Sequence, residues 1–149
     1  GNRDQNKRAK MGKIADIFSD KIYLTDDNPR LEQPSKIRKD IKKGIKKQKV
    51  LEFSNRAKAI RKAIKHLSTG EILLVAGKGH EKVQEIGLKK IFFSDKKIIL
   101  GAIKIKNLNL SNNLKVNILN ELSTEKKISN QISLDKARIN SKKIKKSNK

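Results

Sequence analysis

The run ILLVA at residues 72–76 constrains the fold more than any other stretch of this sequence. It is the longest purely apolar segment of the chain, and Gly70 and Gly77 bound it on the two sides. A short apolar run with such limits is typical of a strand buried on both faces, as in the middle of a parallel sheet. Because parallel strands are joined by crossing helices, this run predicts an α/β fold.

Two strand, loop and helix units precede that run. Residues 21–25 predict a strand, the turn DDNPR follows it, and a helix begins at Pro34 with isoleucines at helical spacing. Residues 50–53 predict a second short strand, and Ser54 is a suitable N-cap for a helix that ends near residue 67. The apolar stripe expected on that helix consists of Ala57, Ile60, Ala63, Ile64 and Leu67. This alternation predicts a mostly parallel sheet.

Further elements are expected at both ends. Residues 10–18 predict a short amphipathic helix, in which Met11, Ile14, Ala15 and Phe18 share one face. Residues 83–93 predict a hairpin or an edge strand, and a last helix begins at Ser94 and Asp95. Beyond residue 105 the sequence becomes rich in asparagine, so we expect a domain over residues 1–105, a linker over 106–113 and a separate segment over 114–149.

The net charge of +23 points to a nucleic-acid or anionic-membrane partner. Its lysines are spread over the whole length, however, and no RNA-binding motif accompanies them. A lysine-rich genomic composition therefore explains residues 1–105 better, and the lysine-rich C-terminus less well, so we expect neither a nucleic acid nor a membrane as partner. The chain has no cysteine, which suits a reducing cytosol. No apolar run approaches the roughly 20 residues of a membrane helix, and no signal peptide is visible. We therefore expect a cytoplasmic location.

Three charged stretches are candidates for chemistry: GNRD at the start, DDNPR after the first strand and GKGHE after the apolar run. Loops at the carboxyl edge of a parallel sheet converge on one crevice. There Arg3 and Arg30 suit carboxylates, Glu81 suits an ammonium group, and Asn28 can both donate and accept hydrogen bonds. This set predicts a site for a zwitterionic amino acid.

Each of these features also has a simpler interpretation. Two glycines after a strand are most often part of a turn, and the G-x-x-x-x-G-K-[ST] spacing of a phosphate loop is absent. His80 suits a local hydrogen bond, since no metal triad surrounds it. Arg30 or Glu81 taken alone is a surface charge. Only their combination supports a site.

Four stretches of the chain carry a resemblance: GNRDQNKRAKMGKIAD, IYLTDDNPRLEQPSKIRKDIKKGI, NRAKAIRKAI and ILLVAGKGHEKVQ. Over residues 1–105 they resemble the C-terminal domain of the Mur ligase family, most closely the type known as MurE. The resemblance implies a Rossmann-like domain with a mostly parallel sheet, here truncated at its N-terminal side. It also implies an ATP-dependent amide ligase of bacterial peptidoglycan biosynthesis, a process of cell-wall biogenesis linked to cell shape and division.

In that family ATP phosphorylates the terminal carboxylate of UDP-MurNAc-L-Ala-D-Glu, and the amine of meso-diaminopimelate attacks the acyl phosphate. The resemblance implies that ATP and Mg²⁺ bind mainly to a central domain that these 149 residues do not contain. We therefore expect no catalytic residue and no metal site in this chain, which should be inactive and poorly stable by itself. The DNPR motif is the diaminopimelate version, and the positions that correspond to substrate contacts are Arg3, Asp27, Asn28, Arg30, Gly77 and Glu81.

The last 36 residues have a weaker resemblance. VNILNELS and ISLDKARINSKKIKKSNK are similar to the opening of MurF, the ligase of the next step, although Asn140 and Lys142 depart from the usual Asp and Arg, and Ser147-Asn148 from the usual Gly-Asp. An in-frame fusion of two ligases and a disordered basic tail both remain open. For the whole chain, the alternative function is a small basic RNA- or ribosome-associated binding module.

Overall fold

A computed structural model describes the backbone of residues 1–47 and 49–147, with side chains up to 121 and at 123–124. The chain divides into two units, Gly1–Lys106 and Asn107–Lys149, and each is considered by itself. The elements in chain order are α1 (Asn6–Phe18), β1 (Ile22–Thr25), α2 (Pro34–Lys42), β2 (Val50–Phe53), α3 (Arg56–His66), β3 (Val83–Ile86), β4 (Lys89–Phe92) and α4 (Asp95–Ser147).

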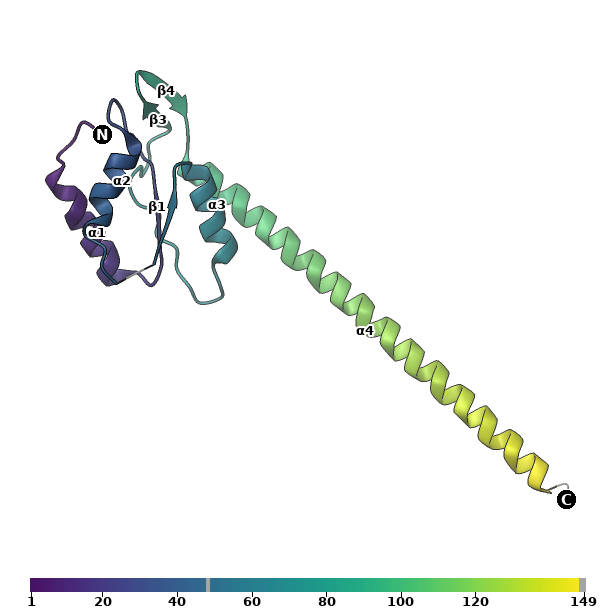
Figure 1. The fold of residues 1–149 in the computed structure, drawn as a ribbon. Helices are drawn as coiled ribbons and strands as arrows, with labels where there is room; N and C mark the ends of the chain where they lie inside the picture. Colours follow the sequence, from purple (N-terminus) through teal and green to yellow (C-terminus); the bar gives the residue numbers. More distant parts are fainter. Residues whose placement is uncertain (48, 148–149) are drawn as a thin grey trace. The chain divides into compact units, whose positions relative to one another are not determined.

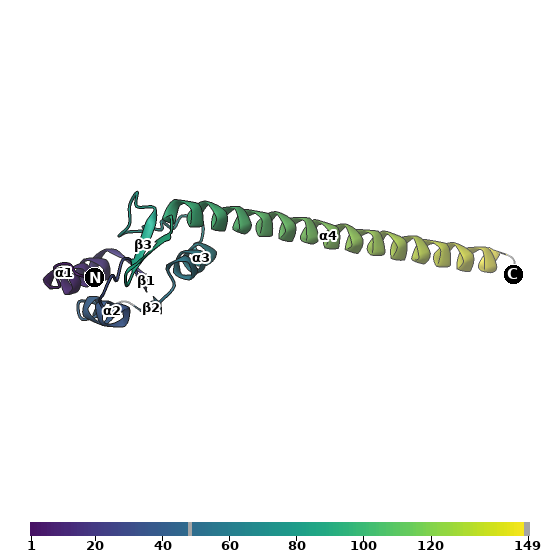
Figure 2. The same ribbon diagram turned by 90° about the horizontal axis from the view of Figure 1, so that it is seen from above.

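The first unit is an α/β domain built around a small parallel sheet. Strands β1 and β2 pair in parallel, with Ile22 opposite Val50 at one end and Thr25 opposite Phe53 at the other. Helices α1 and α2 lie on one side of this pair and α3 on the other (Figures 1 and 2). The predicted strands at 21–25 and 50–53 and the helix that connects them are thereby confirmed.

The hydrophobic core lies between α3 and the first turns of α4. Ile60, Ile64 and Ala102 are buried there, and Leu73 and Val75 pack against them. The predicted stripe on α3 is correct at Ile60, Ala63 and Ile64, whereas Ala57 and Leu67 are only half-buried.

The N-terminus of α3 differs from its prediction by one residue. Asn55 is the N-cap, and its side-chain oxygen accepts a 2.9 Å hydrogen bond from the backbone N–H of Lys58. Serine and asparagine are both favoured at the N-cap, so residue type alone does not distinguish Ser54 from Asn55. The cap bond distinguishes them, since it fixes which residue immediately precedes the first helical turn.

The apolar run at residues 72–76 is an extended segment rather than the predicted strand buried on both faces. Ile72 is 93% exposed and Leu74 is 84% exposed, whereas Leu73 and Val75 face the core. In the described part of the chain no strand pairs with this segment, and β1 pairs only with β2. A cavity of about 70 Å³ lies between the segment, α3 and β1, with Thr25 and Ile60 in its lining.

Helix α1 was predicted correctly as a helix but with the wrong face inward. Arg8, Gly12 and Asp16 are its buried residues, while Met11 and Phe18 are exposed. Ile14 is exposed too and Ala15 is half-buried. Apolar spacing could not reveal this, because the buried face is held by polar contacts and close backbone approach.

Those polar contacts come from both ends of α1. The Arg8 guanidinium forms ion pairs with Glu32 at 2.8 Å and Asp40 at 3.2 Å. The Asp16 carboxylate accepts hydrogen bonds from the backbone N–H groups of Lys46 and Lys47 at 3.1 and 3.0 Å. These partners lie before, in and after α2, so α1 and α2 are fastened together along their length.

The remaining elements follow their predictions closely. β3 and β4 form an antiparallel hairpin that turns at Gly87, whose φ is +59°. Helix α4 begins at Asp95, as expected, and continues through residues 106–113 to Ser147. The predicted linker and the origin of the tail stay predictions, and Asn148 lies outside the described residues. Among the described residues, no helix is long and apolar enough to cross a membrane.

Two helical glycines provide a matched test of the α1–α2 packing. A Cβ on Gly12 would lie 2.0 Å from the backbone oxygen of Ile41, whereas a Cβ on Gly101 in α4 would meet nothing within 4 Å. We expect Gly12→Ala to lower the free energy of unfolding by about 1–3 kcal/mol through overpacking. Gly101→Ala should raise it by about 0.5–1 kcal/mol. Urea unfolding of both variants measures this, and equal effects would contradict the packing.

Candidate functional site

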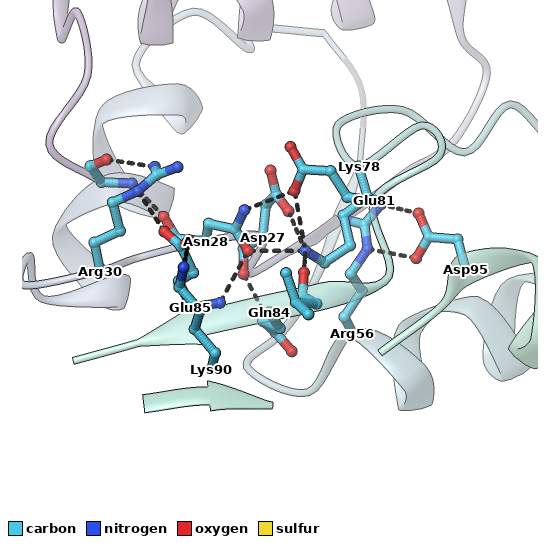
Figure 3. Close-up of polar contacts among 12 residues, drawn as sticks. Asp27, Asn28, Arg30, Arg56, Lys78, Glu81, Gln84, Glu85, Lys90 and Asp95 are labelled. Carbon is cyan, nitrogen blue, oxygen red and sulfur yellow. Dashed lines mark hydrogen bonds and ion pairs between the residues drawn. The ribbon is translucent and has the colours of Figure 1, made fainter. Parts of the chain in front are cut away.

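The loop after β1 and the loop after residues 72–76 meet beside strand β3 (Figure 3). The first loop carries Asp27, Asn28 and Arg30, and the second carries Lys78 and Glu81. The two loops are about 50 residues apart in the sequence, so their contact is a property of the fold. Both follow apolar extended segments, which bring their polar side chains to the same rim.

Backbone hydrogen bonds attach the first loop to β3. The N–H of Arg30 donates to the oxygen of Glu85 at 3.1 Å, and the N–H of Gly87 donates to the oxygen of Arg30 at 2.8 Å. The buried side-chain amide of Gln84 donates to the backbone oxygen of Asp27 at 2.6 Å. The loop is therefore held at both of its ends, and its side chains are presented in fixed positions.

Asn28 is the buried centre of the first loop, with 7% of its surface exposed. Its Oδ1 accepts hydrogen bonds from Lys78 Nζ at 2.8 Å and from the backbone N–H of Glu85 at 3.1 Å. Its Nδ2 donates to Glu81 Oε2 at 2.8 Å. One amide thus connects both loops with β3.

The Lys78 side chain is completely buried, and oxygen atoms surround its ammonium group. Besides Asn28, Nζ contacts the backbone oxygen of Val83, Asp27 Oδ1 at 3.2 Å and Glu81 Oε2 at 3.6 Å. Asp27 Oδ1 makes no hydrogen bond of good geometry, so its contact with Lys78 is an ion pair only. A buried cation requires such compensation, because desolvation of an unpaired charge is costly.

Glu81 stands partly in solvent, with 45% of its side chain exposed. The hydrogen bond from Asn28 holds the pKa of this carboxyl below its usual range, and the charges of Lys78 and Arg30 act in the same direction. Glu81 is therefore an anion at neutral pH. An exposed anion on a rigid loop is suited to hold an ammonium group.

Arg30 lies at the other end of the cluster in a strained conformation. Its φ is +51°, which side-chain-bearing residues rarely adopt and which is frequent at functional sites. Its Nε forms a 2.7 Å ion pair with Glu85, and its Nη1 donates to the backbone oxygen of Gly1 at 2.9 Å. Arg30, Glu85, Asn28 and Glu81 thus form a continuous chain of contacts along one rim.

Gly77 begins the second loop with φ +115°, a conformation that favours glycine. The segment before it is anchored by Arg56, whose Nη2 donates to the backbone oxygen of Ala76 at 2.9 Å. The same guanidinium binds Asp95 through two contacts of 2.8 and 2.6 Å, and both side chains are over 90% buried. This pair ties the base of the second loop to the N-termini of α3 and α4.

The structure brings together five of the six residues that the sequence predicts for the site: Asp27, Asn28, Arg30, Gly77 and Glu81. Arg3 is exposed and forms none of the contacts described for this cluster. His80 is exposed as well. Among the described residues, no three His, Cys, Asp or Glu side chains are placed to hold a metal ion.

Four residues of the cluster were not predicted: Arg56, Lys78, Gln84 and Glu85. Lys78 and Glu85 are charged residues in a chain where 36% of residues are charged, so residue type gave no signal. For Lys78 the position between two glycines after an apolar run was the available clue. Gln84 and Glu85 act through partners 57 residues away, which no local pattern encodes.

Comparison with known proteins gives a consistent result. The family model described as Mur ligase, glutamate ligase domain, matches residues 1–79. The UDP-N-acetylmuramoyl-L-alanyl-D-glutamate–2,6-diaminopimelate ligase of Rickettsia rickettsii is 50% identical over 105 residues, which make up 70% of this chain and 22% of that protein. The ligase of the same name from Wolinella succinogenes is 47% identical over 104 residues, or 69% of this chain and 24% of that protein.

A solved structure of a ligase with this name also matches. It has a TM-score of 0.68 and 36% identity, and the match covers 72% of this chain and 22% of that one. This chain therefore spans about a fifth of the length of the relatives that it matches.

The buried pair of Arg56 and Asp95 yields a stability test. Asp95→Asn removes the negative charge with little change of shape and leaves the guanidinium buried beside a neutral amide. We expect the free energy of unfolding to fall by about 3 kcal/mol, measured by urea denaturation. Asp20→Asn, at an exposed position, is the control and should change it by less than about 0.5 kcal/mol. A similar small loss in both variants would show that the pair does not hold the second loop.

Proposed function

The chain belongs to the Mur ligase family, and from this premise we propose that it is the amino-acid-binding C-terminal domain of an ATP-dependent ligase. The ligase would add meso-diaminopimelate to UDP-MurNAc-L-Ala-D-Glu during peptidoglycan biosynthesis in the cytoplasm. The rim formed by Arg30, Asn28 and Glu81 carries this proposal, because it offers cationic and anionic groups within one rigid cluster. Two relatives that are 50% and 47% identical to this chain over 105 and 104 residues have names that state this activity.

The chemistry of the rim fits an amino acid that is charged at both ends. meso-Diaminopimelate differs from lysine by a second carboxylate at its far end, and a guanidinium binds a carboxylate through two parallel hydrogen bonds. We assign Arg30 to this carboxylate and Glu81 to an ammonium group. Asp27 adds a second anion, and Gly77 allows the substrate to approach the backbone.

Arg3 remains part of the proposal as a second guanidinium for carboxylates. It is exposed here and forms no contact in the cluster, so its role requires that bound substrate draw it in. The residues of the rim hold and orient the amino acid. No residue of this chain is assigned to bond making.

The described residues do not form a complete site for ATP and Mg²⁺. The sequence contains no phosphate-loop motif, and the described residues contain no cluster of acidic side chains for a metal ion. We propose that another domain of the parent enzyme binds both and that this domain closes over them, since exclusion of water protects a hydrolysable intermediate. The 149 residues alone should therefore not ligate.

The proposal extends to domain organisation. Residues 1–105 form a partial Rossmann-like domain with a mostly parallel sheet, residues 106–113 are a linker, and residues 114–149 are the start of a MurF-like domain or a basic tail. The division of the structure after Lys106 supports a domain boundary near residue 105.

Arg30→Ala tests the assignment of the far carboxylate. The test uses a chimera in which residues 1–105 replace the 105 matching residues of the Rickettsia rickettsii ligase. We expect kcat/KM for meso-diaminopimelate to fall about 100-fold or more, because the loss of a charged hydrogen-bond pair leaves the carboxylate without its partner. Arg61→Ala, on the exposed face of α3, is the control and should leave kcat/KM within about twofold. Unchanged kinetics in Arg30→Ala would remove Arg30 from the site.

Salt dependence separates this function from the alternative of a basic RNA-binding module, which the charge of +23 favours. A protein that neutralises many phosphates loses about 10³- to 10⁵-fold in affinity between 50 and 200 mM salt. The affinity for diaminopimelate should fall less than about tenfold over this range of salt, since its contacts with the rim are short and partly buried. Calorimetry with the amino acid and with a structured RNA measures both. Tight, steeply salt-dependent RNA binding without amino-acid binding would favour the alternative.

A further inference from the structure

We propose that Lys78 is a positioning residue, whose buried ammonium group orients the side-chain amide of Asn28 so that only its N–H donors face the substrate. The inference rests on the proposed function for its consequence, but its structural part can be tested without any substrate. Lys78 itself does not touch the substrate, because its side chain is completely buried. Its effect must pass through the side chains that it contacts.

Oxygen atoms from both loops surround the ammonium group of Lys78. Lys78 Nζ lies within 3.6 Å of oxygens from Asp27, Asn28 and Glu81. These three residues come from both loops of the rim, and all three belong to the proposed substrate site. Because an ammonium group only donates hydrogen bonds, every atom that it contacts must be an acceptor.

The neighbours of the Asn28 side chain fix the orientation of its amide. Lys78 Nζ and the backbone N–H of Glu85 are both donors, so the atom between them must be Oδ1. The carboxylate of Glu81 is an acceptor, so the atom facing it must be Nδ2. A flipped amide would place NH₂ against two donors and Oδ1 against a carboxylate, which makes all three contacts unfavourable.

This orientation determines which atoms of Asn28 remain available to a ligand. The Asn28 oxygen is engaged twice, so it is not available to an ammonium group of the substrate. Nδ2 can only donate, and one of its two N–H groups already donates to Glu81, so the second N–H is the one that suits a substrate carboxylate. The ammonium group must then be held by the exposed carboxylates of Asp27 and Glu81, which are 41% and 45% exposed. Lys78 thereby decides which end of a zwitterion each part of the rim accepts.

Hydrogen exchange of the Glu85 backbone amide tests the structural part in the 149-residue chain without substrate. In Lys78→Met the ammonium is lost while side-chain length is kept, and the Asn28 amide is held only by Glu85 and Glu81, so its hydrogen bond with the Glu85 N–H weakens. We expect exchange of the Glu85 N–H to become about tenfold faster or more, as measured by NMR. Lys82→Met makes the same change at an exposed position of the same loop and should leave the rate unchanged. Equal rates in the two variants would overturn the proposal.

Steady-state kinetics in the chimeric ligase test the functional part. Lys78→Met should raise KM for diaminopimelate about tenfold or more, with KM for ATP unchanged and kcat within about threefold. Because Lys78 acts through Asn28, adding Lys78→Met to Asn28→Ala should cause little further loss. Additive losses would overturn the proposal, since they would mean that the two residues act independently.

Asn28→Asp keeps the test decisive should Lys78→Met fail to fold. Asp retains the acceptor for Lys78 and for the Glu85 N–H but replaces the Nδ2 donor by an oxygen. We expect it to raise KM for diaminopimelate as much as Asn28→Ala does, and undiminished affinity would overturn the donor assignment. A wild-type chimera that does not use diaminopimelate would instead contradict the proposed function, and the hydrogen-exchange result would remain valid.

Discussion

The need to compensate buried charges governs the geometry of this domain's rim. Lys78 places a full positive charge where water does not reach, so oxygen atoms must surround it. The loops that supply these oxygens are thereby held together and against β3. Arg56 and Asp95 satisfy the same requirement at the base of the second loop. The rim is positioned by polar contacts, whereas the apolar core lies beneath it, between α3 and α4.

Local sequence pattern predicted the elements that local physics determines. The strands at β1 and β2 and the helix α3 were recognisable because apolar residues recur there with the period of each structure. The pattern failed where remote partners decide the outcome. Residues 72–76 have strand composition but pair with no described strand, and the buried face of α1 carries Arg8 and Asp16 because their partners lie at α2. Five of the six candidate residues lie together in the structure, but Lys78, which contacts Asp27, Asn28 and Glu81, was identified only from the fold.

Charge is distributed differently at the rim than in the chain as a whole. The chain carries a net charge of +23, yet at the rim the three carboxylates of Asp27, Glu81 and Glu85 contact three cations, Lys78, Arg30 and Lys90. Positive charge therefore predominates over the chain as a whole, whereas the charges at the rim are balanced. A balanced rim fits the proposed amino-acid ligand better than it fits a phosphate backbone.

Position 30 combines a left-handed backbone conformation with a charged side chain. Glycine would adopt a φ of +51° without strain, but glycine has no guanidinium to offer a carboxylate. The conformation is maintained from outside, by the two backbone hydrogen bonds to β3 and by the ion pair with Glu85. Glycine at position 30 would relieve the backbone strain but would also remove the guanidinium and its ion pair with Glu85. A substitution that makes the backbone here more comfortable therefore costs the domain the cation to which we assign the far carboxylate.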